Sequence, residues 1–302
     1  MTSVGEDSDT FALALVGAGI GGSLTPAMHE NEGRAQGLSV TYRRVDLEAL
    51  GLGVGDLPEV LNWARRFGLD GLNITHPCKQ AVLPLLDQVA PSAAAIGAVN
   101  TVVISEGRLT GHNTDASGFV AALRHALPDA LAGAAVLLGA GGAGSAVAYA
   151  VLAAGMPHLT VVDVDVSRRE ALVSHLADRF SADRVAAAAT AEVPLARAGG
   201  FINATPIGMA GRPGLPLDEG LVRPDLWVAD IVYVPVKTPL VRLARSRGCR
   251  VMDGAGMAVR QAVAAFQLFT GRSADADRMH AHFARLLSGG ESSEREPQRF
   301  GA

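Results

Sequence analysis

The sequence predicts an α/β protein that contains a doubly wound parallel sheet. Three observations predict it: a glycine-rich turn that follows a short apolar segment, a second apolar segment that ends in an aspartate, and an alternation of short apolar segments with helical ones along the chain. A length of 302 residues fits one large domain or two ordinary ones.

The glycine-rich turn has the spacing of a dinucleotide-binding loop. Ala134–Leu138 is apolar and predicts a buried strand, and the alanine-rich Ala146–Ala154 predicts the helix that follows. Glycines in a G-x-G-x-x-G pattern permit a tight turn, let a pyrophosphate approach bare backbone, and let the helix pack closely on the strand. We therefore expect the phosphates to bind at this helix start, on Gly139, Ala140, Gly141, Gly142, Ala143 and Gly144.

The next expected strand, Leu159–Val162, leads to Asp163 at about the spacing of a ribose-binding acid. A carboxylate here accepts hydrogen bonds from a 2′-hydroxyl and repels a 2′-phosphate. No arginine stands at Val164 or Asp165 to bind that phosphate, although Arg168 follows and could still do so. These residues favour NAD over NADP, and we interpret Asp165 as a solvated or helix-capping carboxylate.

Composition excludes several classes of protein. Hydrophobic residues make up 49% of the chain and charged ones 19%, which is ample for a core, and a net charge of −4 argues against a nucleic-acid partner. No apolar run approaches the length of a membrane span, and the acidic, polar start is not a signal peptide. Two cysteines form no metal or disulfide pattern, so we expect a reducing cytoplasm.

The first third of the chain begins with an expected strand, Phe11–Val16, and a second apparent glycine pattern, Gly17–Gly22. We assign no cofactor to this pattern, because Ser23–Pro26 stands where a phosphate-binding helix would run. Thr25 fits an N-cap for the helix Ala27–Gln36. The next expected elements are the strand Val40–Val45 and the helix Leu57–Phe67.

Lys79 is the first candidate catalytic residue. Gly71–Thr75 predicts a short strand, and Pro77 fits the first position of a helix, which places Lys79 in the first turn at the carboxyl end of a strand. Ligands bind at such ends in α/β sheets, and the positive end of a helix dipole disfavours an ammonium group. Lys79 is therefore a functional candidate, with an ordinary surface lysine as the alternative.

Polar residues surround the next expected strand, Ala98–Ile104, which has Asn100 near its start. Gly107-Arg108 predicts a hairpin turn, and Leu109–Asp115 predicts a polar loop before the helix Ala116–Leu127. Taken alone, Asp115 fits an N-cap for that helix better than a catalytic role.

The remaining two fifths of the chain continue the alternation. The expected strands and turns are Phe201–Met209, Trp227–Tyr233 and Val251–Asp253. Expected helices are Ala258–Gly271, which contains Gln261, and the amphipathic segment Ser273–Ser288. Gln261 is either a functional amide or a residue on a solvated helix face. Residues 289–302 are polar and charged and predict a disordered tail.

Seven motifs, in order, resemble those of the shikimate dehydrogenase family, and the chain looks most like the NAD-using quinate/shikimate dehydrogenases of actinobacteria. The resemblance covers residues 12 to 287. It rests on Ser23–His29, Asn73–Lys79, Gly97–Thr101, Gly111–Asp115, Gly139–Gly144, Asn203–Met209, and Gly254 with Met257 and Gln261.

The resemblance implies two domains and assigns roles to residues. Residues 1–116, with helices 257–288 packing back onto them, would form the substrate-binding catalytic domain, and residues 117–256 a Rossmann-type NAD-binding domain. Lys79 and Asp115 match the catalytic pair. Residues that match substrate-binding positions are Ser23, Thr25, Thr75, Asn100, Tyr233 and Gln261; Thr205, Met209 and Gly254 match positions near the nicotinamide.

Three residues depart from the family pattern. Gly22 replaces a histidine, which makes that edge of the site less polar, and Thr25 replaces a serine, as in members that accept quinate. Val164 replaces the basic residue that NADP-using members carry after the second cofactor strand. This last departure agrees with the interpretation of Asp163.

The resemblance implies NAD-dependent, reversible oxidation of quinate or shikimate, cyclitol carboxylates, to 3-dehydroquinate or 3-dehydroshikimate, with no metal. Two alternatives are an NADP-dependent shikimate dehydrogenase of aromatic amino-acid biosynthesis and an aminoshikimate dehydrogenase. A third is a regulatory module that binds NAD without chemistry, which the presence of both Lys79 and Asp115 disfavours. The sequence ranks neither quinate against shikimate nor the direction of reaction, and it is compatible with a monomer or a homodimer.

Overall fold

The computed structural model describes residues 10–293, which form two six-stranded sheets joined by long helices. The first sheet is mixed. β1 pairs in parallel with β2 and β3, whereas β5 is antiparallel to both β3 and β6. From edge to edge, its strands are β2 (Ser39–Asp46), β1 (Thr10–Gly17), β3 (Gly71–Ile74), β5 (Thr101–Ser105), β6 (Arg108–His112) and β4 (Gln88–Val89).

Four helices accompany this sheet: α1 (Thr25–Ala35), α2 (Leu57–Arg66), α3 (Cys78–Ala81) and α4 (Pro91–Ile96). Helix α2 shows why they form and where they pack. Its apolar residues recur at helical spacing and are buried against β1 and β3, while the charged residues between them face solvent. The buried residues are Leu57, Val60, Leu61 and Ala64.

All strands of the second sheet are parallel, as the alternating pattern predicted. Because both faces of such a sheet are covered by helices, the strands are mostly apolar. From edge to edge they are β9 (Val185–Ala188), β8 (Leu159–Val162), β7 (Ala135–Leu138), β10 (Gly200–Asn203), β11 (Trp227–Asp230) and β12 (Arg250–Met252). This is the doubly wound order, and its direction reverses between β7 and β10, where such sheets bind dinucleotides.

The helices of the second sheet are α6 (Gly142–Ala153), α7 (Val166–Phe180), α8 (Glu192–Leu195) and α9 (Pro239–Ser246). Single turns of 3-10 helix lie at Val54–Asp56, Leu83–Leu85, Ala130–Ala132, Ala182–Arg184 and Glu219–Leu221.

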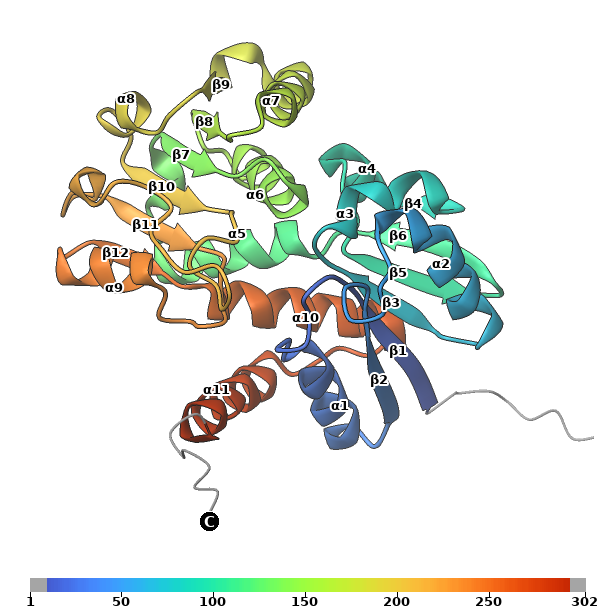
Figure 1. Cartoon of the computed structure of the whole chain (residues 1–302). Helices are drawn as coiled ribbons and strands as arrows, with labels where there is room; N and C mark the ends of the chain where they lie inside the picture. Colours follow the sequence, from blue (N-terminus) through green and yellow to red (C-terminus); the bar gives the residue numbers. More distant parts are fainter. Residues whose placement is uncertain (1–9, 294–302) are drawn as a thin grey trace, which may run out of the picture.

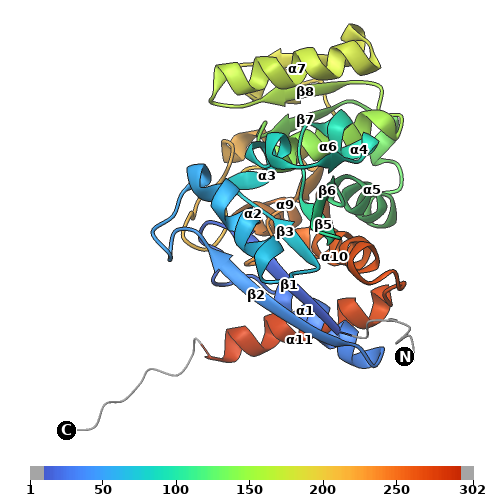
Figure 2. The same ribbon diagram turned by 90° about the vertical axis from the view of Figure 1, so that its right-hand side faces the viewer.

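Two long helices lie between the sheets, α5 (Asp115–Ala126) and α10 (Gly254–Thr270) (Figure 1). They cross closely at Gly118, where an added Cβ would lie 2.9 Å from the backbone nitrogen of Gln261. Helix α11 (Ala276–Ser293) then lies beside α1 in both views (Figures 1 and 2). There Arg278 forms an ion pair with the buried carboxylate of Glu32 at 2.6 Å. The chain thus returns to the first sheet.

Several local predictions were wrong. The expected polar loop Leu109–Asp115 is mostly strand β6, because Arg108–His112 pairs with β5. The expected tail begins too early, since 289–293 continue α11, and 294–302 lie outside the described residues. Helix α10 starts four residues before the expected Ala258, because the Asp253 side chain accepts a hydrogen bond from Ala255 N. In the described part of the chain, no helix is long and apolar enough to cross a membrane.

Candidate functional site

Lys79 and Asp115 are in direct contact. Lys79 Nζ lies 2.6 Å from Asp115 Oδ2, and the two side chains are 14% and 6% exposed. A charge-assisted hydrogen bond of this length in a mostly dry setting holds both groups in one geometry. It places an amine beside a carboxylate, with the amine still partly accessible.

The mixed sheet explains why residues so distant in sequence meet. The carboxyl end of β3 leads to Lys79, and because β5 is antiparallel to β3, its first residue lies at the same edge, with Asn100 immediately before it. The end of β6 returns to this edge and leads to Asp115. Lys79 O accepts a hydrogen bond from Val99 N at 2.8 Å, and Asn100 Nδ2 donates to Asp115 Oδ1 at 2.9 Å.

Asp115 does not cap its helix. It is the first residue of α5, and the side-chain oxygen of Asn113 accepts hydrogen bonds from Asp115 N and Ala116 N at 3.1 and 3.2 Å. Asn113 therefore does the capping that the sequence assigned to Asp115. This leaves both carboxylate oxygens of Asp115 for Lys79 and Asn100. Asn113 was missed because nothing local distinguishes it from Asp115 as a cap.

The helix that carries Lys79 is shorter than expected. Pro77 precedes α3 as its N-cap residue instead of occupying its first position, and α3 is one turn long. The dipole of a single turn is weak, because it sums few aligned peptide units. The contacts with Asp115 and with the start of β5 therefore fix Lys79 more than the helix start does.

Two residues expected to bind substrate, Ser23 and Thr25, lie in and after the loop that follows β1. Both are buried, and Ser23 Oγ accepts a weak hydrogen bond from Thr25 N at 3.4 Å. Arg44 Nη2 donates to Ser23 O at 2.7 Å and fixes the loop from β2. Thr25 is the first residue of α1, after Leu24, so its expected role as N-cap was wrong.

The first glycine pattern, Gly17–Gly22, to which we assigned no cofactor, allows close packing between loops. An added Cβ at Gly17 would lie 2.3 Å from Thr75 Cγ2, so the glycine lets this loop contact the segment that leads to Lys79. The N–H groups of Gly19 and Ile20 donate to the Asp46 carboxylate at 3.0 and 2.8 Å. These donors are therefore already used and do not face a phosphate.

The second glycine pattern has the three properties that a dinucleotide needs. Gly139 has a φ of +107°, which forms the tight turn. An added Cβ at Gly144 would lie 1.9 Å from Gly139 O, so the helix packs directly on the strand. At Gly141, no described atom outside the adjoining residues lies within 4 Å of an added Cβ. Helix α6 begins at Gly142, and its first N–H groups have no acceptor inside the helix, so the loop fits a pyrophosphate.

Asp163 lies at the end of β8 beside this loop and is 9% exposed. Its carboxylate accepts hydrogen bonds from Ala140 N at 2.6 Å and from Asp165 N at 2.9 Å. Asp165 caps α7 by accepting from Arg168 N, which confirms its interpretation as a capping residue. The Arg168 guanidinium lies 3.6 Å from the Asp165 carboxylate, and Val164 is 99% exposed.

The cofactor loop and the ion pair are neighbours. An added Cβ at Gly142 would lie 2.7 Å from Lys79 Cβ, so the start of α6 contacts the stem of the lysine. Helix α3 accompanies the first sheet and helix α6 the second, and the two helices are in contact. The loop that fits a dinucleotide thus lies against the lysine whose amine could exchange a proton.

The residues expected near the nicotinamide gather at the ends of β10 and β11. An added Cβ at Gly139 would lie 3.2 Å from Thr205 Cγ2, and one at Gly254 would lie 2.4 Å from Val232 O. Ala210 N, next to Met209, donates to Val234 O, next to Tyr233, at 3.0 Å. These loops therefore lie side by side.

A buried polar cluster that the sequence analysis missed supports these loops. Asp230 accepts hydrogen bonds from Thr238 Oγ1 at 2.7 Å and from Asn203 Nδ2 at 3.0 Å, and Asn203 Oδ1 accepts from Thr205 Oγ1 at 2.7 Å. Burial raises the pKa of Asp230 against the opposing effect of these donors. Polar residues that end apolar strands, Asn203 and Asp230, were the signal that could have identified the cluster.

Gln261 is half-buried on α10, and its amide donates to Ala258 O at 3.0 Å within its own helix. Its backbone packs against α5, the helix that begins with Asp115, and among the described residues its side chain is not hydrogen-bonded to the ion pair.

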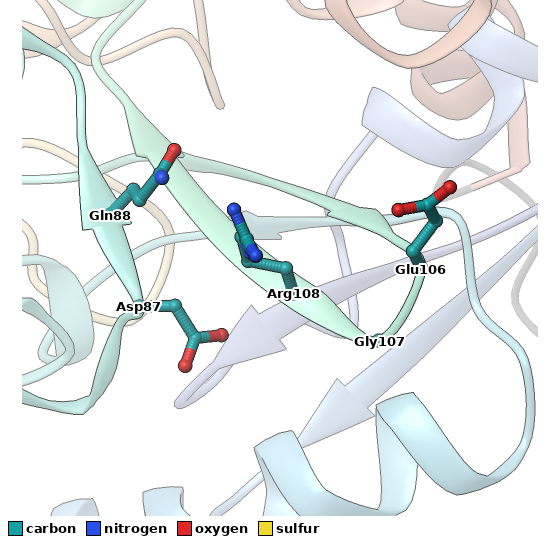
Figure 3. Close-up of a pocket in the computed structure, with 5 residues that line it drawn as sticks. All are labelled: Asp87, Gln88, Glu106, Gly107 and Arg108. Atoms are coloured by element: carbon teal, nitrogen blue, oxygen red, sulfur yellow. The ribbon is translucent and has the colours of Figure 1, made fainter.

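A polar pocket lies at the other end of the β5–β6 hairpin from Asn100 and Asp115 (Figure 3). There the carboxylate of Asp87 accepts from Arg65 Nη2 at 2.6 Å and Leu109 N at 2.7 Å. We do not assign the reaction to this pocket, because it lacks the loop and the lysine. It is lined by Asp87, Gln88, Glu106, Gly107 and Arg108.

Comparison with known families gives two matches. Residues 15–102 match the shikimate dehydrogenase substrate-binding domain, and residues 254–282 match the shikimate 5′-dehydrogenase C-terminal domain. The first range holds Ser23, Thr25, Lys79 and Asn100, and the second holds Gly254 and Gln261.

The chain is similar over almost its whole length to several proteins with the names of shikimate or quinate dehydrogenases. It is 54% identical to a shikimate dehydrogenase (NADP(+)) of Arthrobacter sp., covering 94% of this chain and 98% of the relative. It is 48% identical to a quinate/shikimate dehydrogenase (NAD(+)) of Corynebacterium efficiens, covering 92% and 99%. Quinate dehydrogenase from Corynebacterium glutamicum in complex with NAD superposes with a TM-score of 0.83 at 46% identity, covering 91% and 99%.

Proposed function

The chain belongs to the shikimate dehydrogenase family of NAD- or NADP-dependent oxidoreductases, and we propose that it catalyses the NAD-dependent, reversible oxidation of quinate or shikimate to 3-dehydroquinate or 3-dehydroshikimate. The observation that carries the proposal is the buried contact between Lys79 and Asp115, with the glycine-rich loop against the lysine stem. This contact supports the proposal, because an amine that could exchange a proton would then lie near a bound hydride carrier.

A nicotinamide dinucleotide held by the glycine-rich loop from Gly139 to Gly144 would supply the acceptor for the hydride of the carbinol carbon. The amine of Lys79 takes the proton from the hydroxyl oxygen during oxidation and returns it during reduction. Asp115 holds the amine in place and balances the ammonium that forms. An ammonium within reach also stabilises negative charge on the substrate oxygen.

We propose that the rest of the first sheet and its helices bind the cyclitol carboxylate. Polar side chains of the loops after β1 and β3, of the start of β5, and of the facing loop and helix would bind its hydroxyls and carboxylate. These are Ser23, Thr25, Thr75, Asn100, Tyr233 and Gln261. On this proposal residues 1–116 and helices 257–288 form the substrate-binding catalytic domain, and residues 117–256 form the NAD-binding domain.

The proposed cofactor-binding residues are Gly139 to Gly144, Asp163, Arg168, Thr205, Met209 and Gly254. Three features support NAD over NADP. The buried carboxylate of Asp163 would repel a 2′-phosphate, Val164 offers no charge, and Arg168 is paired with Asp165. The alternative, an NADP-dependent shikimate dehydrogenase of aromatic amino-acid biosynthesis, is favoured by the relative from Arthrobacter.

The deciding experiment is a steady-state matrix of quinate and shikimate against NAD and NADP. We expect kcat/KM to be at least about tenfold higher with NAD for whichever substrate is turned over, a difference of roughly 1.4 kcal/mol. A preference for NADP would support the alternative. Binding of NAD without hydride transfer to any cyclitol carboxylate would overturn the enzyme proposal.

Both buried cysteines are free thiols, which agrees with the expected cytoplasmic location.

A further inference from the structure

An unbroken line of buried hydrogen bonds leads from Tyr42, in the middle of β2, to Lys79. It passes through β3 and β5 to Asp115, the first residue of α5, which contacts Lys79. Tyr42 Oη donates to Asn73 Oδ1 at 2.5 Å, and Asn73 Nδ2 donates to Thr101 Oγ1 at 3.1 Å. Thr101 Oγ1 donates to Asn100 Oδ1 at 3.0 Å, and Asn100 Nδ2 donates to Asp115 Oδ1 at 2.9 Å. The last bond runs from Lys79 Nζ to Asp115 Oδ2 at 2.6 Å.

These groups are shielded from water. Between Tyr42 and Asp115, every residue of the line is at most 4% exposed. A buried polar group without a partner is destabilising, so each group depends on its neighbour in the line. Asn73 is a polar residue within a fully buried strand, and its partners on β2 and β5 explain its presence there.

The line has a fixed direction. Burial, with a smaller effect of Tyr233, raises the pKa of Tyr42 well above its ordinary value, so its hydroxyl keeps its proton and donates. Asn73 Nδ2 also donates to the backbone oxygen of Asn100 at 3.2 Å, and because that oxygen can only accept, the Asn73 amide presents its oxygen to Tyr42 and its NH2 group to Thr101. The hydroxyl of Thr101, which accepts from Asn73, is left to donate to Asn100 Oδ1.

The last step orients the amide that contacts Asp115. Asn100 Oδ1 accepts from Thr101 and also from Thr114 N at 2.8 Å, so the NH2 group of Asn100 faces the Asp115 carboxylate. With the amide reversed, two acceptor oxygens would face each other. The carboxylate would then turn away, and its contact with Lys79 would loosen.

We propose that Tyr42 and Asn73 are positioning residues for the reaction, which act through Thr101 and Asn100 to hold the Asp115 carboxylate against Lys79. This inference rests on the proposed function, because it assigns their effect to proton exchange at Lys79. Neither residue touches the lysine, and the effect of each passes along the line.

The first test is Tyr42→Phe, which keeps the ring that packs against His29 and removes the donor hydroxyl. Thr101→Val cuts the same line two steps later with little change in volume. We expect each variant to lower kcat about tenfold, as for other groups that orient a catalytic residue, and to shift the pH profile of kcat while leaving KM for NAD unchanged. Tyr149→Phe, whose ring packs on Phe180 away from the line, is the matched control.

The double variant separates a shared line from two independent defects. If both residues act through the line, Tyr42→Phe adds less than twofold to the loss in Thr101→Val, because the line is already cut. Full multiplication of the two losses, or wild-type kcat and pH profile in both single variants, would overturn the inference. The far-UV spectrum and NAD affinity identify any variant that does not fold, and the other single variant then decides. If the wild type itself transfers no hydride, the proposed function fails, and this inference fails with it.

Discussion

The α-carbon of Gly142 lies so close to Lys79 that an added Cβ would be 2.7 Å from Lys79 Cβ and 3.3 Å from Lys79 Cδ. The fourth residue of the cofactor loop therefore contacts the stem of the proposed catalytic lysine, although α3 accompanies the first sheet and α6 the second. A side chain at position 142 would displace either the lysine or the loop.

Replacing Gly142 with alanine should therefore affect turnover. The lysine stem sits on a one-turn helix tied to β5, so a shift of several tenths of an ångström at Cβ is passed to the amine. A misplacement of about 1 Å can cost up to about 100-fold in rate, and we expect kcat to fall by at least about tenfold at saturating NAD. Wild-type kcat with an unchanged melting temperature would show that Lys79 and the loop are not coupled.

Alanine substitutions at Gly141 and Gly144 should affect different properties, cofactor binding at Gly141 and stability at Gly144. The space at Gly141 is open among the described residues, so Gly141→Ala should leave the melting temperature unchanged and raise KM for NAD about tenfold or more. Gly144→Ala would place a Cβ 1.9 Å from Gly139 O and should lower the melting temperature by several degrees. Thermal melts and cofactor titrations of both variants measure the contrast. An unchanged KM for NAD in Gly141→Ala would mean that the open space at Gly141 does not receive the cofactor.

Val164 offers a test of cofactor choice at little cost to the fold. Its side chain is 99% exposed, so Val164→Arg should change stability by less than about 0.5 kcal/mol. An arginine there can pair with a 2′-phosphate, and kcat/KM with NADP should rise by about tenfold or more. Val193→Arg, on another exposed valine, is the control for added charge. No gain with NADP would place the 2′ position of the ribose elsewhere.

His29 should make the protein sensitive to acid. Its ring is buried, neither ring nitrogen has a partner among the described residues, and burial lowers its pKa from 6.5 to about 3, against a smaller opposing effect of Glu32. The unfolded chain therefore takes up a proton below pH 6.5 that the folded protein does not. The resulting stability is present above pH 6.5 and declines as the pH falls toward 3.

His29→Leu removes this linkage. Wild type loses about 1.36 kcal/mol of unfolding free energy per pH unit below pH 6.5 through His29, and the variant does not. The unfolding free energy of the variant minus that of wild type should therefore be about 2 kcal/mol larger at pH 5 than at pH 7.5. Urea unfolding at the two pH values measures it. A difference between variant and wild type that stays constant with pH would contradict the buried, neutral histidine.

The sequence predicted part of the second sheet, because the signals of its buried strands are local. The strand Leu159–Val162 has the predicted bounds, since a buried parallel strand is mostly apolar. Strand β9 was not predicted, and the expected segments Phe201–Met209 and Trp227–Tyr233 run past the ends of β10 and β11. Strand β6 was missed because Thr110, Gly111 and His112 are polar or small and lie beside a two-residue strand near the sheet edge. Its existence depends on pairing with β5, which periodicity does not report.

The candidate site shows the same limit. Lys79 could be identified from its place after a short strand, but the meeting of Asp115 with Asn100 depends on the register of the β5–β6 hairpin. The line from Tyr42 likewise joins residues on strands that are distant in sequence. Without the family resemblance, Asp115 would have been taken as a cap, because short-range patterns favour that role for an aspartate at a helix start.

The most direct measurement is the turnover of Lys79→Ala, with dissociation constants for substrate and NAD determined on the same preparation. Both ligands should bind within about threefold of wild type, while kcat falls by roughly 10²–10⁴-fold, the range for a positioned acid–base group. A near-normal kcat with normal binding would mean that another group exchanges the proton and that the contact with Asp115 serves only the fold.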